Sequence, residues 1–377
     1  MPNIAIIGSG PAGCFLAEIL ALKLSDVQID IYERLSHPFG LAVSGVAPDH
    51  LHTRKVTEQF ERTLARDNVK LIVNTEVGST ISYSELKQHY DRVVFATGAS
   101  EDRRLGIPGE HLTGVYGSGC FTRWYNSHPE HKDVQPLIGQ RVGIIGNGNV
   151  ALDIARVLAK TAQEHQASAL SEPVRTHLAK SNISEIHIFG RRGPADASFS
   201  LPELTELGTL AQAEVQVSSD ALIGIEAQNL PPSQKKMLQQ LQQYAETPAD
   251  ASAAIQIQFH FYATPVAAIG TTQLEALEIR DSRLDNLDSS SLESLPLDSL
   301  QLDTLITAIG YYTPAIAGVP YDAERGRFAH NQGKIEPGVY CLGWCQRGPQ
   351  GVIPTNRSEA MNLARQLIRE LESQDVD

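Results

Sequence analysis

The sequence predicts an α/β protein that contains two parallel-sheet units. Short runs of apolar and β-branched residues alternate with helical patterns along the 377-residue chain, which is typical of β-α-β units. Two of these runs, residues 4–7 and 141–145, lead directly into glycine-rich turns. The length is also comfortable for two domains.

The first glycine-rich turn, residues 8–13, reads Gly-Ser-Gly-Pro-Ala-Gly. A helix over residues 14–23 and a strand over residues 27–32 complete a β-α-β unit. Such a turn lets backbone N–H groups approach a pyrophosphate at the start of the helix. Glu33 follows the second strand, about 20 residues beyond Gly13, where a carboxylate binds ribose hydroxyls and repels a 2′-phosphate. We therefore expect FAD or NAD here, with a ligand-free tight turn as the weaker alternative.

The second turn, residues 146–151, reads Gly-Asn-Gly-Asn-Val-Ala. A helix is expected over residues 149–164, and the answering strand over residues 183–189. That strand ends in Arg191 and Arg192 instead of an acid. Guanidinium groups suit phosphate oxygens, so this unit is predicted to bind NADP. A solvated basic pair is the alternative interpretation.

The remaining pattern predicts a discontinuous first domain. Residues 1–104 and 311–377 are expected to form an FAD-binding domain, and residues 105–310 an NADP-binding domain inserted into it. The other expected elements are helices over 51–66, 231–254 and 358–372; strands over 69–73, 92–98, 255–261, 302–310 and 338–343; an insertion at 166–182; and a Ser/Leu/Asp-rich surface excursion or hairpin at 281–303.

Composition excludes several classes of function. The net charge is −13, from 44 acidic and 31 basic residues, which argues against binding nucleic acid or an anionic membrane. No run approaches the roughly 20 apolar residues of a membrane helix. The four cysteines form no Cys-x-x-Cys pair and no iron–sulfur ligand set, so a dithiol acceptor and a resident metal centre are not expected. Scattered thiols fit a reducing cytoplasm.

Two further groups of residues are candidates for chemistry. Residues 343–353 form a glycine-rich junction in which Trp344 is expected either over a ring system or in the core. Glu203 and Glu206 share a face if their segment is helical. Hydride transfer needs alignment of the reacting groups more than acid–base catalysis. His50 is expected to be either a proton donor or a structural residue.

Several motifs together resemble a known family. The chain is similar to adrenodoxin reductase and the bacterial NADPH–ferredoxin reductases, among the glutathione-reductase-like FAD flavoproteins. The motifs that carry this resemblance are residues 38–41 (Pro-Phe-Gly-Leu), 45–50 (Gly-Val-Ala-Pro-Asp-His), 124–126 (Trp-Tyr-Asn), 146–153, 191–194 (Arg-Arg-Gly-Pro) and 343–353.

The resemblance, together with the glycine-rich turns, assigns residues to each cofactor. The residues expected at FAD are Gly8, Gly10, Ala12, Gly13, Glu33, Leu41, Val77, Trp344, Gly351, Val352 and Ile353. Those expected at NADP are Gly146, Asn147, Gly148, Asn149, Val150, Arg191, Arg192, Glu203 and again Gly351. By resemblance, His50 and Glu206 are the catalytic pair and give polar support near the nicotinamide.

The predicted function is hydride transfer from NADPH to FAD, followed by transfer of single electrons to a ferredoxin-type iron–sulfur protein. Family members are longer, and they often have arginine where Val43 and Thr205 stand here. Basic residues near Thr205 help the family to dock acidic ferredoxins, so the acceptor stays open. The alternatives are a flavin reductase for a quinone, a dye or a larger electron-transfer system, a hydroxylating flavoprotein, and a nucleotide sensor without turnover.

Overall fold

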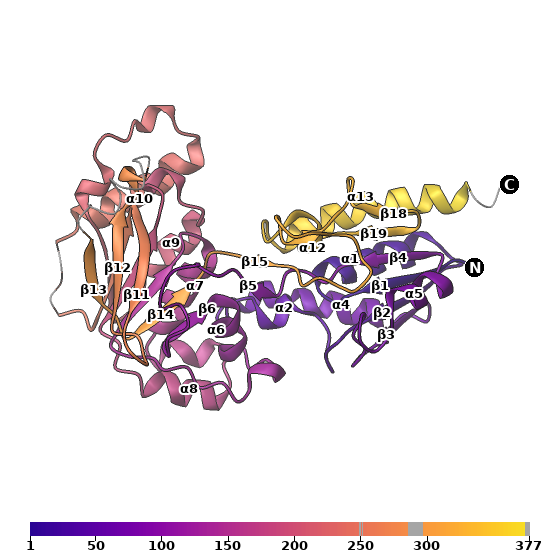
Figure 1. Ribbon diagram of the computed structural model, residues 1–377, viewed down its shortest axis with the longest axis horizontal. Helices are drawn as coiled ribbons and strands as arrows, with labels where there is room; N and C mark the ends of the chain where they lie inside the picture. Colours follow the sequence, from indigo (N-terminus) through magenta and orange to yellow (C-terminus); the bar gives the residue numbers. More distant parts are fainter. Residues whose placement is uncertain (249, 251, 286–296, 374–377) are drawn as a thin grey trace. The chain divides into compact units, whose positions relative to one another are not determined.

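The computed structural model describes residues 1–248, 250, 252–285 and 297–373, and it divides into two compact units. Unit 1 comprises Met1–Val46, His50–Glu101 and Gly310–Asp377. Unit 2 comprises Ala47–Asp49 and Asp102–Ile309. Each unit contains a six-stranded sheet, and the predicted α/β class is confirmed (Figure 1).

Unit 1 is built around the sheet order β18-β19-β4-β1-β2-β3. All neighbours are parallel except the antiparallel pair β18–β19. Its elements are β1 (Asn3–Ile7), α1 (Pro11–Lys23), β2 (Gln28–Tyr32), α2 (Leu41–Ser44), α3 (Leu51–Arg54), α4 (Val56–Leu64), β3 (Val69–Ile72), α5 (Tyr83–His89), β4 (Arg92–Phe95), β15 (Tyr311–Tyr312), β16 (Tyr321–Asp322), β17 (Arg327–Phe328), β18 (Lys334–Glu336), β19 (Val339–Cys341), α12 (Trp344–Arg347) and α13 (Ile353–Glu372); β5 (Glu101–Asp102) lies where the units divide.

Unit 2 is built around the sheet order β6-β14-β7-β8-β10-β9, which is parallel throughout. A separate antiparallel sheet has the order β11-β12-β13. The elements are β6 (Val115–Gly117), α6 (Ser118–Tyr125), η1 (Pro129–His131), β7 (Arg141–Ile145), α7 (Asn149–Ala159), η2 (Glu164–Ala167), α8 (Glu172–Ala179), β8 (Glu185–Gly190), η3 (Pro194–Asp196), α9 (Leu201–Leu207), β9 (Ala213–Val217), η4 (Ser219–Leu222), η5 (Ala227–Asn229), α10 (Pro232–Glu246), β10 (Ile255–Phe261), β11 (Ala263–Ile269), β12 (Ala276–Asp281), η6 (Ser282–Leu284), β13 (Asp298–Gln301) and β14 (Thr304–Thr307).

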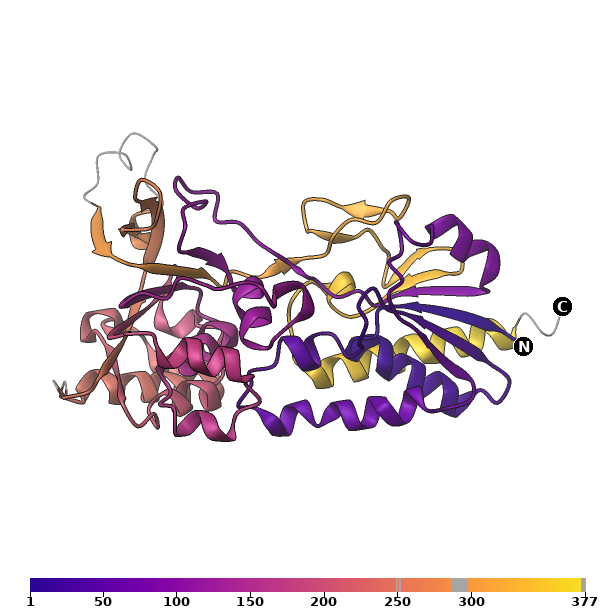
Figure 2. The ribbon, with the colours of Figure 1, turned by 90° about the horizontal axis from the view of Figure 1, so that it is seen from below.

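Buried apolar side chains hold each sheet to its helices. In unit 1, α1 and α13 lie together on one face of the sheet (Figure 2), and Leu16, Leu20, Leu363 and Leu367 belong to one buried cluster. In unit 2, α7 contributes Ile154 to the largest buried cluster. Since parallel sheets bury both faces, their strands read as continuous apolar runs, as residues 4–7 of β1 and 93–95 of β4 do.

Several predicted helices have other bounds in the structure. The helix expected over 231–254 ends at Glu246, as α10. The helix expected over 51–66 is two helices, α3 and α4, separated at Lys55. The helix expected to end at residue 164 ends at Ala159, because Lys160 is extended (ψ 142°). The C-terminal helix begins five residues earlier than expected, at Ile353, because a proline in the first helical turn is tolerated.

The structure also describes much of the two segments that were predicted less specifically, the insertion and the Ser/Leu/Asp-rich excursion or hairpin. The expected insertion, residues 166–182, contains α8. Of the expected hairpin over residues 281–303, β12 and β13 pair antiparallel, while residues 286–296 lie outside the described part. Within the described chain, no helix has both the length and the apolar character needed to cross a membrane.

Candidate functional site

The first glycine-rich turn leaves space only at its middle glycine. Gly8 has φ +109°, and a Cβ there would lie 2.5 Å from the Ala96 carbonyl oxygen. A Cβ on Gly13 would lie 2.1 Å from the Gly8 carbonyl oxygen, so both positions need glycine for packing. A Cβ on Gly10 would meet nothing within 4 Å. The turn lies between β1 and β4, where the strand order of the sheet reverses, which is the usual nucleotide position in such sheets.

The start of α1 fits a pyrophosphate. Gly10 is the N-cap residue of α1, and no side chain caps its first N–H groups. These N–H groups and the helix dipole favour an anion at this point. The open space at Gly10 and the uncapped donors are therefore suited to the pyrophosphate of FAD.

Glu33 is buried at the end of β2 and ties this turn to the strand. Its Oε2 accepts hydrogen bonds from the Ser9 backbone N–H (3.2 Å) and hydroxyl (2.5 Å). Its Oε1 accepts one from the Leu35 N–H at 3.0 Å. Since a carboxylate has about four acceptor sites, Glu33 retains capacity for a ribose hydroxyl.

The glycine-rich junction before α13 lies against the first turn. Gly343 has φ +76°, and a Cβ there would lie 2.8 Å from the Ala12 Cβ. Trp344 is partly exposed and stacks on Tyr311, with ring centroids 6.0 Å apart and an interplanar angle of 14°. Its indole N–H donates to the Gln350 carbonyl at 3.0 Å. Trp344 is therefore not a fully buried core aromatic.

The second turn repeats the geometry of the first. Gly146 has φ +139°, and a Cβ there would lie 2.3 Å from the Ala308 carbonyl oxygen, again where the strand order reverses. A Cβ on Gly148 would meet nothing within 4 Å. The third position is Ala151, which is fully buried. Gly148 is also the N-cap of α7, and no side chain caps that helix.

Asn147 supplies unused polar atoms to this second turn. Its Nδ2 and Oδ1 are both buried and make no hydrogen bond within the described chain. The amide occupies the space where a Cβ of Gly190 would stand, 1.7 Å from Nδ2. Unpaired buried polar atoms are costly, so a donor and an acceptor at this turn fit a polar ligand such as the NADP pyrophosphate.

Arg191 and Arg192 follow β8, and both are exposed. Arg192 donates to the Ser198 hydroxyl at 3.2 Å. Neither guanidinium forms an ion pair with a carboxylate of the described residues. Two adjacent arginines without acidic partners, in a chain of net charge −13, fit the 2′-phosphate of NADP.

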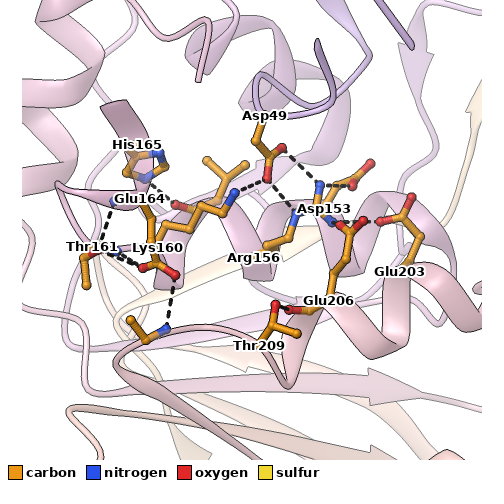
Figure 3. Close-up of polar contacts among 12 residues, drawn as sticks. Asp49, Asp153, Arg156, Lys160, Thr161, Glu164, His165, Glu203, Glu206 and Thr209 are labelled. Carbon is orange, nitrogen blue, oxygen red and sulfur yellow. Dashed lines mark hydrogen bonds and ion pairs between the residues drawn. The ribbon is translucent and has the colours of Figure 1, made fainter. Parts of the chain in front are cut away.

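A network of charges in unit 2 surrounds Arg156, which is 2% exposed (Figure 3). Arg156 contacts Asp49 through Nε (2.8 Å) and Nη2 (3.1 Å), and Asp153 through Nη2 (2.6 Å). Its Nη1 contacts Glu203 at 2.7 Å and Glu206 at 3.3 Å. The helix α9 therefore places both glutamates on one face, as predicted, and α7 orients them.

The network controls ionisation as well as position. Burial alone would raise the pKa of the Asp49 carboxyl, but hydrogen bonds from Arg156 and Lys160 lower this pKa well below its usual value. Burial alone would lower the pKa of the Arg156 guanidinium, but Asp49, Asp153 and Glu203 raise it. Both shifts favour the charged forms, Asp49 as an anion and Arg156 as a cation.

His50 directly follows this anchored segment. Residues Ala47–Asp49 belong to unit 2, whereas His50 begins the next part of unit 1 as the N-cap residue of α3. Lys160 Nζ contacts Asp49 at 2.6 Å, and the Ala169 N–H donates to the Pro48 carbonyl at 2.7 Å. The backbone immediately before His50 is thus held in place.

The described structure brings the predicted residues together within each unit. All residues expected at FAD lie in unit 1, including partly buried Leu41 in α2, buried Val77, and Gly351 and Val352 just before Ile353, the first residue of α13. Gly146 to Val150, Arg191, Arg192, Glu203 and Glu206 lie in unit 2. That Gly351 touches both nucleotides and that His50 acts with Glu206 stay predictions.

Sequence reasoning missed Arg156 and Lys160. Their signal was an arginine on the buried face of an amphipathic helix, three residues after Asp153 and four before Lys160. A buried arginine is rare unless it is paired. That rule predicts partners for Arg156, but it does not identify them.

Comparison with known proteins agrees with this geometry. Residues 2–187 match the family model described as pyridine nucleotide-disulphide oxidoreductase. The chain is 34% identical to an NADPH-ferredoxin reductase, FprA, of Mycobacterium tuberculosis, over 98% of this chain and 84% of the relative. It is 36% identical to the cindoxin reductase of Citrobacter braakii (99% and 78%). It is 32% identical to the human mitochondrial NADPH:adrenodoxin oxidoreductase (99% and 79%).

Solved structures also resemble this chain. The structure of Mycobacterium tuberculosis FprA in complex with NADPH superposes with a TM-score of 0.92 at 33% identity, covering 99% of this chain and 85% of that one. A thioredoxin reductase of T. acidophilum shares only the fold, with a TM-score of 0.57 at 16% identity.

The fold and the paired nucleotide turns define a pyridine-nucleotide oxidoreductase with two dinucleotide-binding units. Within that class, the chain belongs to the family of adrenodoxin reductases and NADPH–ferredoxin reductases.

Proposed function

We propose that this protein is an NADPH–ferredoxin reductase in which unit 1 binds FAD and unit 2 binds NADPH. The observation that carries the assignment is the difference between the two turns. One is followed by the carboxylate of Glu33 and the other by Arg191 and Arg192, which form no ion pair with a carboxylate of the described residues. A carboxylate selects ribose hydroxyls, and an arginine pair selects a 2′-phosphate.

The residues of this chain perform binding and orientation. When bound, FAD accepts a hydride from NADPH and releases the electrons singly to an iron–sulfur protein. Uncapped N–H groups at α1 and α7 hold the two pyrophosphates. Arg156 fixes Glu203 and Glu206, which give polar support on the nicotinamide side together with His50. A cytoplasmic location is part of the proposal, and the four free cysteines support it.

The acceptor is a small ferredoxin-type iron–sulfur protein, and the relatives are named after several different acceptors. Their names specify ferredoxin, adrenodoxin and cindoxin. The purified protein is expected to show the absorption bands of oxidised flavin, which NADPH bleaches without oxygen. Reduction of cytochrome c is then expected to require added ferredoxin.

Each other outcome of this assay identifies a different function. Equal rates without ferredoxin identify a quinone or dye reductase. Oxygen uptake coupled to a hydroxylated product identifies a hydroxylase. A flavin that binds but never bleaches identifies a nucleotide sensor. A colourless protein that binds no added FAD contradicts the proposal.

The double variant Arg191→Ala/Arg192→Ala tests the nucleotide assignment. We expect it to lose about 1.5–3 kcal/mol of NADPH binding, or about 10–150-fold, since a hydrogen bond to a charged group has this value. Binding of NADH is expected to stay constant, so the ratio of kcat/KM for NADPH and NADH falls. A double variant with full NADPH preference would place the 2′-phosphate elsewhere.

A further inference from the structure

The turn that carries Arg191 and Arg192 is built against a second segment of unit 2. The Ser282 hydroxyl donates a hydrogen bond to the Arg191 carbonyl. The Ser282 N–H donates to the Tyr262 carbonyl at 2.7 Å, and the Tyr262 N–H to the Arg192 carbonyl at 3.4 Å. Arg283 follows Ser282, so a third arginine lies in the segment that packs against this turn.

Tyr262 has an unusual backbone at this place. Its φ is +57°, the left-handed region that a bulky residue rarely adopts, and it stands between β10 and β11. Its hydroxyl lies 2.3 Å from where a Cβ of Gly193 would stand, so the glycine lets the phenol approach the turn. Backbone strain of this kind is frequent at ligand sites.

Arg283 lies over this ring. Its guanidinium carbon is 4.9 Å from the centroid of the Tyr262 ring, which is a cation–π distance. Its Nε donates to Asp281 at 2.9 and 3.0 Å, and Nη2 also contacts that carboxylate. The side chain is 61% exposed, and Nη1 has no partner among the described residues. A stacked arginine with an available N–H edge is well suited to a phosphate.

The charges around the turn favour a dianion. Arg191 and Arg192 have no acidic partner in the described chain, whereas Arg283 is paired with Asp281 and also lies in the field of Asp220, so two of the three arginines keep an uncompensated charge. We propose that Arg283, supported by Tyr262, is a third residue that recognises the 2′-phosphate of NADP, and that Asp281 weakens this recognition. This inference rests on the proposed function, because it assumes that NADP binds at the second turn.

The test uses two variants with opposite expected effects. Dissociation constants of 2′,5′-ADP and 5′-AMP are measured by calorimetry on the FAD-loaded enzyme. Arg283→Gln is expected to weaken 2′,5′-ADP about three- to tenfold, between the values of an exposed ion pair and a charged hydrogen bond. Asp281→Asn is expected to strengthen it, since a negative charge beside the phosphate is removed. Neither variant should change the affinity for 5′-AMP, which lacks the 2′-phosphate.

Arg325→Gln is the matched control, because Arg325 is an exposed arginine of unit 1 whose Nε lies 3.8 Å from Asp322. Its affinity for both ligands is expected to equal that of the wild type. Unchanged 2′,5′-ADP affinity in Arg283→Gln would overturn the inference and leave the proposed function intact. Weaker binding in Asp281→Asn would overturn the role of Asp281. A wild type that does not prefer 2′,5′-ADP to 5′-AMP would overturn the NADP assignment and the inference together.

Discussion

Among the residues of unit 2, Arg156 has an unusual position, because its guanidinium is buried among four carboxylates. Asp49, Asp153, Glu203 and Glu206 all contact it, and Lys160 adds a second positive charge beside Asp49. Buried charges require partners, so the buried guanidinium depends on these carboxylates and they depend in part on it.

We expect Arg156→Met to lower the free energy of unfolding by about 3–5 kcal/mol, since removing one partner leaves buried charges uncompensated. Urea unfolding followed by circular dichroism measures this change. The matched control Arg325→Met removes an exposed arginine and is expected to cost within about 1 kcal/mol. If both variants lose the same small amount, the network around Arg156 does not stabilise unit 2.

At the scale of elements, each strand–turn–helix unit has a glycine that packing requires and a glycine with open space, where we propose that the nucleotide binds. Gly10 and Gly148 have negative φ angles and open space, so the fold itself does not require glycine there. Gly13 packs directly against the Gly8 backbone.

Valine substitutions test whether a glycine is needed for binding or for packing. Gly10→Val is expected to weaken FAD binding by about 1.5–3 kcal/mol or more, because the side chain displaces the pyrophosphate from its N–H donors. The stability of the FAD-free protein should change little. Gly148→Val should weaken the binding of NADPH by a similar amount, while FAD stays bound.

Gly13→Val is expected instead to destabilise the FAD-free protein by about 1–3 kcal/mol, through overpacking. Flavin absorbance per protein and thermal unfolding of the FAD-free forms separate the two effects. Equal instability of the Gly10 and Gly13 variants would contradict this division.

The neighbouring strands β8 and β10 carry a histidine pair in which His187 is buried and His260 is partly buried. His187 Nδ1 and His260 Nε2 are 3.0 Å apart, and His187 Nε2 is 3.1 Å from Glu185 Oε2. Burial, with the nearby His187, lowers the pKa of His260 to about 4. Burial also lowers the pKa of His187, although Glu185 partly opposes this.

Both histidines therefore bind protons more weakly in the folded state than in the unfolded state, where the pKa is about 6.5. Their contribution to stability is complete above about pH 6.5 and is lost as the pH falls towards about 4. For His260 this amounts to at most about 3.4 kcal/mol, since its pKa falls from 6.5 to about 4 and each pKa unit corresponds to about 1.36 kcal/mol.

His260→Gln should flatten the loss of stability between about pH 6.5 and pH 4.5, since glutamine can still hydrogen-bond to His187 but does not titrate. Urea unfolding at several pH values measures the slope. His89→Gln, at an exposed position, should leave the slope unchanged. A slope that His260→Gln does not alter would show that other groups control acid stability.

At the scale of the whole molecule, the net charge of −13 opposes an acidic partner. Thr205 is exposed on α9, at a position where the family often has arginine. Long-range repulsion slows association and is screened by salt. The acceptor protein is therefore expected to meet an unfavourable field.

The rate of reduction of an acidic ferredoxin is thus expected to rise between about 20 and about 200 mM KCl, as the Debye length shortens. Thr205→Arg should increase the rate at low salt, with NADPH oxidation by a small neutral dye unchanged. Stopped-flow measurements at several salt concentrations give these rates. A rate that falls with added salt would indicate that a local basic surface dominates docking.

The sequence alone determined the two nucleotide turns and the residues that end the strands after them. Those features depend on a few consecutive residues: glycines at a strand–helix turn, then Glu33 or Arg191 and Arg192 about one β-α-β unit later. Local backbone geometry dictates them, so their placement in the two parallel sheets followed the prediction.

Only the tertiary structure decided how distant segments meet. Asp49 and Arg156 are 107 positions apart, and Arg156 and Glu203 are 47 apart. The tertiary structure likewise decided that α7 ends at Ala159 and that Ser282 contacts Arg191. Such contacts depend on which strands and loops become neighbours in the folded unit, and no spacing rule within one segment contains that information.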